Sequence, residues 1–107
     1  MRRALPLAAL ALAAAPTGAH AAERVVDMPA KYFVPPNITT LAGDTVTWTN
    51  SDHFTHSVQF LDGGLPSEPL LMEPGQSATF TFASAGTFRY QCHFHPQNMQ
   101  GTVTVTP

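Results

Sequence analysis

The stretch Phe88–Val105, which reads FRYQCHFHPQNMQGTVTV, decides how we expect the chain to fold. Apolar side chains occupy every second position from Phe88 to Cys92, and threonine alternates with valine from Thr102 to Val105. A period of two is typical of a half-buried β-strand, and the segment between the two runs, with its proline, asparagine and glycine, is typical of a turn. The stretch therefore predicts two strands joined by a loop, with Cys92 pointing into the protein and His93 pointing away from it.

The same kind of pattern continues through the chain on the N-terminal side of this stretch. Short alternating or extended runs, which we expect to form strands, lie at Arg24–Met28, Tyr32–Val34, Asn37–Leu41, Thr45–Asn50, His56–Phe60 and Ser77–Phe82. Turn residues separate them, and a longer loop with three prolines precedes the last of these runs. Helical periodicity of useful length is absent. The chain therefore predicts an all-β sandwich of seven to eight short strands that forms one domain, residues 22–107.

Strand parity brings two reactive side chains to the interior of this sandwich. His56 shares its parity with the two apolar residues of its run, so it points inward if they do. Cys92 points inward at the end of its own strand. We expect His56 and Cys92 to meet at one end of the sandwich, where the loop after Cys92 brings His95 and Met99 back over them.

These four side chains, His56, Cys92, His95 and Met99, form a set of soft and borderline metal ligands. Thiolate, imidazole and thioether groups suit copper better than magnesium or calcium, which prefer oxygen. Two imidazoles and a thiolate near one plane, with a weak thioether above it, satisfy Cu(I) and Cu(II) with little movement. The pattern therefore favours one copper ion that exchanges single electrons.

Two alternative functions use the same residues. A structural zinc site could be built from Cys92, His56, His95 and one further ligand, although the thioether of Met99 is a poor zinc ligand. The protein could also be a periplasmic copper carrier or storage protein, an alternative to which the extra histidines His53 and His93 contribute. We expect His53 to be a solvated loop residue. Met28 and Met72 have no histidine neighbours in sequence, and we expect both to serve in packing.

Composition excludes several other classes of function. Beyond residue 21, three basic side chains stand against seven acidic ones, which leaves a formal charge of −4 and no basic patch for nucleic acid. The single cysteine cannot form an intramolecular disulfide, the usual staple of small secreted domains. Neither a Ser-His-Asp nor a Cys-His-carboxylate arrangement is evident, so we do not expect an enzyme.

The first 21 residues have the pattern of a secretory signal peptide. Arg2 and Arg3 precede the apolar run from Ala4 to Ala15, and Ala19-His20-Ala21 is a small-x-small cleavage site. The apolar run is too short for a membrane span, which needs about 20 residues. We therefore expect export to the periplasm by the general secretory route and no stable membrane insertion.

The ordered motifs of the remaining chain resemble those of the cupredoxins, the type 1 blue copper proteins, and are similar to the plastocyanin, pseudoazurin and amicyanin branches. The motifs are Gly43-Asp44-Thr45-Val46-Thr47-Trp48-x-Asn50, His56-Ser57-Val58, Tyr90-x-Cys92-x-x-His95-Pro96 and Met99-x-Gly101-x-Val103-x-Val105. The resemblance implies an eight-stranded Greek-key sandwich with one type 1 copper. It also implies that His56 and His95 are the imidazole ligands, Cys92 the thiolate and Met99 the axial thioether.

The resemblance has further implications for partners and for the site. It implies a one-electron carrier between redox proteins of cytochrome or dehydrogenase type, which we expect to be a monomer, with His95 as the electron port beside the apolar residues Phe94 and Pro96. Three residues separate His95 from Met99, whereas amicyanin-like loops have two and plastocyanin-like loops four. An amide oxygen of Asn98, Gln97 or Gln100 is therefore an alternative axial ligand. Ser57 occupies a position where many family members have an asparagine that braces the ligand loop.

Overall fold

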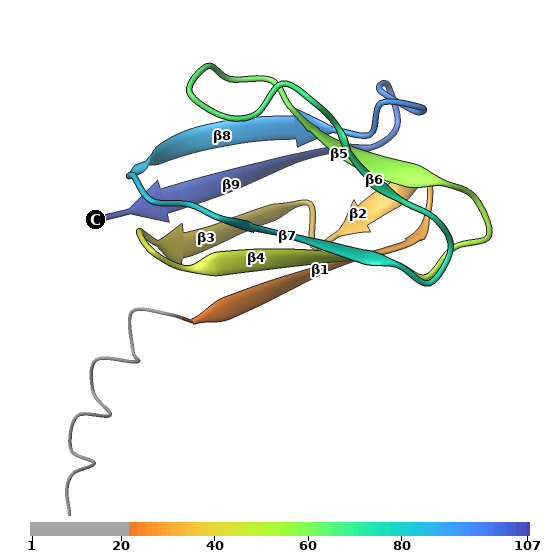
Figure 1. Ribbon diagram of the computed structural model, residues 1–107, viewed down its shortest axis with the longest axis horizontal. Helices are drawn as coiled ribbons and strands as arrows, with labels where there is room; N and C mark the ends of the chain where they lie inside the picture. Colours follow the sequence, from red (N-terminus) through yellow and green to blue (C-terminus); the bar gives the residue numbers. More distant parts are fainter. Residues whose placement is uncertain (1–21) are drawn as a thin grey trace, which may run out of the picture.

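The computed structural model describes residues 22–107, and the predicted signal peptide, residues 1–21, lies outside the described residues. The described chain contains nine strands and no helix (Figure 1): β1 (Glu23–Ala30), β2 (Tyr32–Val34), β3 (Asn37–Leu41), β4 (Thr45–Asn50), β5 (His56–Phe60), β6 (Leu70–Met72), β7 (Ser77–Thr81), β8 (Gly86–Gln91) and β9 (Gln100–Thr106).

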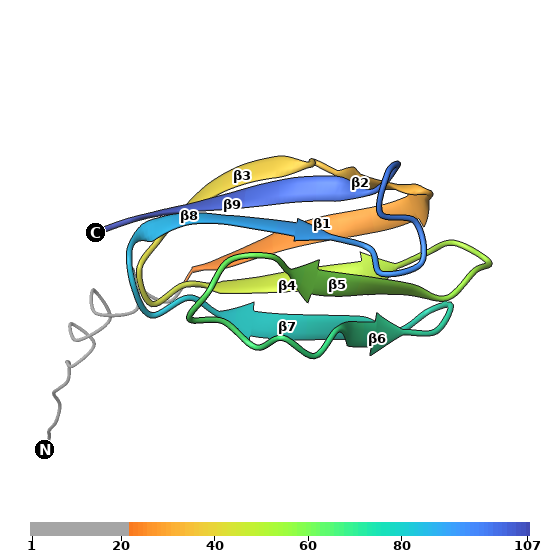
Figure 2. The same ribbon diagram turned by 90° about the horizontal axis from the view of Figure 1, so that it is seen from above.

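The strands form two sheets that face each other (Figures 1 and 2). One sheet has the order β2-β1-β4-β7, and the other has the order β3-β9-β8-β5-β6. The pairs β1–β4 and β3–β9 are parallel, whereas the remaining neighbours are antiparallel. The prediction of an all-β Greek-key sandwich is confirmed.

One strand lies in a segment that the sequence pattern assigned to a loop. β6 comprises only the three residues Leu70–Met72, which is too short a run to display an alternating pattern between its flanking prolines. It is recognisable only from its partner, because it pairs with β5 so that Met72 lies opposite His56. With this additional strand, the described chain has nine strands, whereas the sequence predicted seven or eight.

The core follows the predicted strand parity. Most of the residues expected to face inward are fully or almost fully buried, among them Val46, Trp48, Val58, Phe60, Tyr90 and Cys92. Phe80 and Phe88 are half-buried and pack against this core. Trp48 and Tyr90 meet edge to face with ring centroids 5.3 Å apart, an arrangement that the aromatic quadrupole favours. Tyr90 lies opposite Gly101 in the β8–β9 ladder, and a Cβ at Gly101 would fall 2.4 Å from the Tyr90 ring. Only glycine fits this position, because any side chain would displace the tyrosine from the core.

The two ends of the sandwich carry different parts of the chain. The β4–β5 and β8–β9 connections lie at one end, whereas the start of β1 and the C-terminus lie at the other (Figures 1 and 2). Because Cys92 follows β8 and His56 begins β5, the topology brings the two inward ligands to the first of these ends. Within residues 22–107, no helix could cross a membrane.

Candidate metal centre

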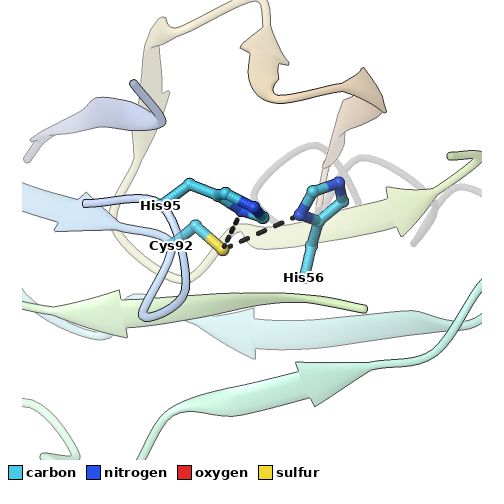
Figure 3. A group of neighbouring side chains, drawn as sticks. All are labelled: His56, Cys92 and His95. Atoms are coloured by element: carbon cyan, nitrogen blue, oxygen red, sulfur yellow. Dashed lines mark hydrogen bonds between the residues drawn. The ribbon is translucent and has the colours of Figure 1, made fainter. Parts of the chain in front are cut away.

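Three of the four predicted ligands lie together at this end. The Nδ1 atoms of His56 and His95 are each 3.8 Å from the Cys92 Sγ atom, and the ligand atoms of the three residues lie within 4.8 Å of one another. Figure 3 shows the two imidazoles directed toward the sulfur, His56 from its strand and His95 from the loop. Across the described residues, no other group of three or more histidine, cysteine or acidic residues has this spacing.

The separation of these atoms fits a metal at their centre. With bonds of about 2.3 Å to sulfur and about 2.0 to 2.1 Å to nitrogen, which are typical of zinc, a trigonal arrangement places sulfur and nitrogen about 3.7 to 3.8 Å apart. Copper is a first-row ion of similar size, so the observed 3.8 Å separations suit it equally well. One thiolate and two imidazoles are also the trigonal donor set typical of blue copper sites.

His56 is held by a carboxylate that the sequence pattern did not indicate. His56 is fully buried at the first position of β5, and its Nε2 atom lies 2.9 Å from Oδ2 of Asp52. With Nε2 bonded to the carboxylate, Nδ1 is left to face the sulfur. The hydrogen bond from His56 and a second one from the His53 backbone N–H hold the pKa of Asp52 below its usual value. The carboxylate therefore stays ionised at neutral pH and fixes the orientation of the ring.

Asp52 is itself positioned by the buried side chain of Asn50, the last residue of β4. The Asn50 Nδ2 atom donates to the carbonyls of Phe54 and Met72, at 2.8 Å and 2.9 Å. Its Oδ1 atom accepts a 2.9 Å hydrogen bond from the Asp52 backbone N–H. One amide thus ties the β4–β5 loop to β6, which explains why this loop presents its carboxylate to His56.

Ser57 supports the Cys92–His93 segment through its hydroxyl group. Its hydroxyl accepts a 2.7 Å hydrogen bond from the His93 backbone N–H and lies 3.9 Å from Cys92 Sγ. Ser57 is fully buried even though its parity differs from that of His56, and its side chain contacts the Cys92–His93 segment. The serine therefore joins the strand that bears one ligand to the loop that bears the others, at the position where the resemblance has an asparagine.

The loop after Cys92 returns to the site through a tight set of backbone hydrogen bonds. The His95 N–H donates to the Cys92 carbonyl at 3.3 Å, and the His95 carbonyl accepts from the Met99 N–H at 2.9 Å. The Cys92 N–H then donates to the Met99 carbonyl at 3.0 Å. Met99 is fully buried, whereas Gln97, Asn98 and Gln100 are exposed. The loop thus places the thioether residue inside the protein and the three amide residues outside it.

His95 has a different electrostatic environment from that of His56. Its side chain is half-buried in a shallow hollow lined by Lys31, Phe94, Pro96, Gln97 and Asn98. Burial, and then the positive charges of His56 and Lys31, lower the pKa of His95 from its usual 6.5, and the Asp52 charge opposes this shift. In the copper-free protein, the neutral imidazole that a metal needs is therefore favoured.

The remaining residues that the sequence indicated lie outside this group. His53 and His93 are exposed, in agreement with their expected places in a loop and on the outer face. Met28 and Met72 are fully buried in the core, as expected of packing residues. The sequence pattern missed Asp52 and Asn50 as supports of the site. The only indication of them in the sequence is that both are polar residues shortly before β5, the strand that begins with His56.

Comparisons with known proteins agree with this centre. Residues 21–106 match the family described as copper binding proteins, plastocyanin/azurin family. The chain is 38% identical over 89 residues to plastocyanin of Scenedesmus fuscus, which covers 74% of this chain and 91% of that protein. It is also 38% identical over 84 residues to amicyanin of Paracoccus denitrificans, which covers 76% of this chain and 63% of that protein.

Solved structures give the same result. A reduced amicyanin variant superposes with a TM-score of 0.70 at 38% identity and covers 78% of this chain and 81% of that one. A purple cupredoxin from Nitrosopumilus maritimus has a TM-score of 0.69 at 30% identity, with 78% and 99% covered.

The chain belongs to the plastocyanin/azurin family of copper-binding proteins. It is a small blue copper protein and an electron carrier of the plastocyanin and amicyanin type, not an enzyme. This membership, together with the geometry of His56, Cys92 and His95, confirms the predicted copper cofactor. The family match favours copper over the alternative of a structural zinc site.

Proposed function

We propose that this protein is exported and carries single electrons between redox proteins, through a copper ion held by His56, Cys92, His95 and Met99. When bound, the copper supplies the Cu(II)/Cu(I) couple. The observation that carries the proposal is the convergence of one thiolate and two imidazole nitrogens, each 3.8 Å from the sulfur, at one end of a rigid sandwich. A site whose ligands are already in place needs little rearrangement when the charge of the metal changes.

Met99 is the proposed axial ligand, in preference to the neighbouring amides. It is the one residue of the 97–100 segment that is buried, and its backbone is bonded to both Cys92 and His95. The side chains of Gln97 and Asn98 are exposed, and Gln100 uses its Nε2 atom to donate to the Pro96 carbonyl. These contacts favour the thioether over an amide oxygen.

Electrons are proposed to pass through His95. It is the ligand with solvent exposure, and the large exposed side chains Phe94 and Phe54 lie on the same end of the molecule, in the loops that carry the site. An apolar surface around a half-buried ligand suits brief contacts with a partner, because electron-transfer interfaces are small and charged residues are depleted at the centre of an interface. Partners of cytochrome or dehydrogenase type are compatible with it.

Export is the remaining part of the proposal. It rests on the leader pattern of residues 1–21, which ends at Ala19-His20-Ala21. Sequencing the N-terminus of protein recovered from a periplasmic extract tests it, and we expect Ala22 as the first residue. A full-length chain retained in the cytoplasm would contradict export and leave the copper chemistry untouched.

The test of the copper function is a visible and EPR spectrum of the protein loaded with Cu(II), followed by cycles of reduction and reoxidation. We expect an intense thiolate-to-copper band, narrow copper hyperfine splitting and full recovery of the colour in every cycle. Cys92→Ser should remove the intense band because the thiolate is lost. His93→Ala is the matched control and should retain the spectrum, since His93 is exposed and lies outside the ligand group.

A pale protein with ordinary copper splitting would contradict this proposal. That result would favour the copper storage or carrier function, in which the metal is handed over and electrons are not. The exposed positions of His53 and His93 give no second group of ligands to support that alternative.

A further inference from the structure

A buried carboxylate lies at the end of the sandwich opposite the metal centre. Asp44 precedes β4 and is fully buried. Its Oδ2 atom accepts hydrogen bonds from the Thr40 hydroxyl and, at 2.9 Å, from the Leu41 backbone N–H. The Thr40 hydroxyl, and then the Leu41 N–H, hold the pKa of Asp44 below its usual value. A buried carboxylate that stays ionised at neutral pH normally has a cationic partner. No basic side chain of residues 22–107 forms a salt bridge with Asp44, and the Arg24 charge makes only the smallest contribution to lowering its pKa.

The other oxygen of this carboxylate contacts the first described residue of the chain. The Ala22 backbone nitrogen donates to Asp44 Oδ1 at 3.1 Å, and the Ala22 carbonyl accepts from the Thr45 N–H, also at 3.1 Å. The parallel β1–β4 ladder begins at the next residue, with Glu23 opposite Thr45. The strand pairing therefore fixes the Ala22 nitrogen beside Asp44.

The Ala22 nitrogen is also the atom that the proposed cleavage would release. We propose that removal of the leader after Ala21 converts the Ala22 amide into an α-ammonium group that forms an ion pair with the buried Asp44 carboxylate, so that maturation itself stabilises the folded protein. The inference rests on the proposed export only for the cleavage site. The role that it gives Asp44 is independent of the metal centre.

The chemistry of the step is peptide hydrolysis by a leader peptidase. One water molecule is consumed, the C–N bond between Ala21 and Ala22 breaks, and the departing segment keeps a carboxylate on Ala21. The Ala22 nitrogen becomes an amine that binds a proton, because an α-amino group has a pKa of about 7.7 to 8.0. A hydrogen bond between two ionised groups is shorter and about twice as strong as a neutral one. Ala22 is exposed, so the ammonium keeps water on its other side.

The test compares four copper-loaded chains that begin at Ala22, which together contain all nine strands and the whole described core. Two of the chains retain Asp44, one with a free α-amino group and one with an acetylated α-amino group. The other two carry Asp44→Asn, again one with a free and one with an acetylated α-amino group. At pH 6.5 we expect the free amine to raise the folding equilibrium constant about fivefold over the acetylated chain. With Asp44→Asn, that advantage should vanish. An equal advantage in both backgrounds, or none in either, would overturn the ion pair.

A second measurement applies even if Asp44→Asn does not fold. The α-amino pKa of Ala22 can be followed by NMR in the unmodified chain, where Glu23 and Arg24 are the neighbouring charged groups. We expect a pKa above the ordinary range of about 7.7 to 8.0, and a value within or below that range would overturn the pairing. A first residue other than Ala22 in exported protein would instead overturn the cleavage site, which separates the two failures.

Discussion

The two histidines of the metal centre both direct Nδ1 toward the Cys92 sulfur, but they differ in burial and in how the protein holds the ring. Each places Nδ1 3.8 Å from Cys92 Sγ. His56 is fully buried on a strand, with its second nitrogen bound to Asp52. His95 is half-buried on a loop, and no hydrogen bond to its second nitrogen is found among residues 22–107.

Because of this difference, the two imidazoles have different roles in the site. The strand, Asp52 and Asn50 determine the orientation of His56, so the protein itself holds that ring in place. The loop holds the backbone of His95 but leaves one edge of its ring near solvent and the exposed Phe94. One histidine thus fixes the geometry, and the other gives access to a partner.

The largest expected effect comes from replacing each histidine with glycine and supplying free imidazole. Both variants should lose the intense copper band. Imidazole should restore the band in His95→Gly, because the vacated space opens toward solvent. It should fail to restore the band in His56→Gly, because that space lies under the β4–β5 loop and is fully enclosed. Titration of each variant with imidazole, followed by visible spectroscopy, measures this. Equal recovery in both variants would mean that burial does not separate the two ligands.

A smaller effect is expected from Asp52→Asn, which alters the hydrogen bond that orients His56. The amide keeps the size of the carboxylate but removes its charge and weakens its hold on Nε2. We expect copper affinity to fall about tenfold, as is typical for the loss of a carboxylate behind a histidine ligand. Removal of a negative charge near the metal also favours Cu(I), so the reduction potential should rise. Competition titration and voltammetry measure the two quantities.

Asp62→Asn is the matched control for this experiment. Asp62 lies beyond the other end of β5 and pairs with Arg89 on an exposed surface, with nitrogen and oxygen 3.0 Å apart. Its replacement removes the same charge but touches no ligand. An equal change of potential in both variants would show that Asp52 acts only through the overall charge of the protein.

Strand parity was enough to predict the frame and the inward ligands. His56 and Cys92 could be placed in the interior because a period of two fixes which face a side chain takes once its neighbours are known to be apolar. The same rule sent His93 outward. These are local properties, and a short run of sequence contains them.

The supports of the site could not be predicted because they depend on pairing between distant segments. β6 has three residues and is recognisable only beside β5. Asp52 reaches His56 because Asn50 ties its loop to the Met72 carbonyl, 22 residues further along the chain. Asp44 meets Ala22 only because β1 pairs in parallel with β4. Periodicity contains no information about such contacts.

The smallest expected effect concerns the pH dependence of the copper-free protein. Burial lowers the pKa of His95 in the folded chain below its usual 6.5, so the unfolded chain binds this proton more readily. The copper-free protein should therefore lose stability as the pH falls from about 6.5 through the lowered pKa, whereas above 6.5 His95 should have no effect. Denaturant unfolding at several pH values, with His95→Gln as the control, isolates this contribution. Because the Asp52 charge opposes the shift, Asp52→Asn should lower the His95 pKa further, which NMR titration can detect. An unchanged His95 pKa in that variant would mean that Asp52 acts on His56 alone.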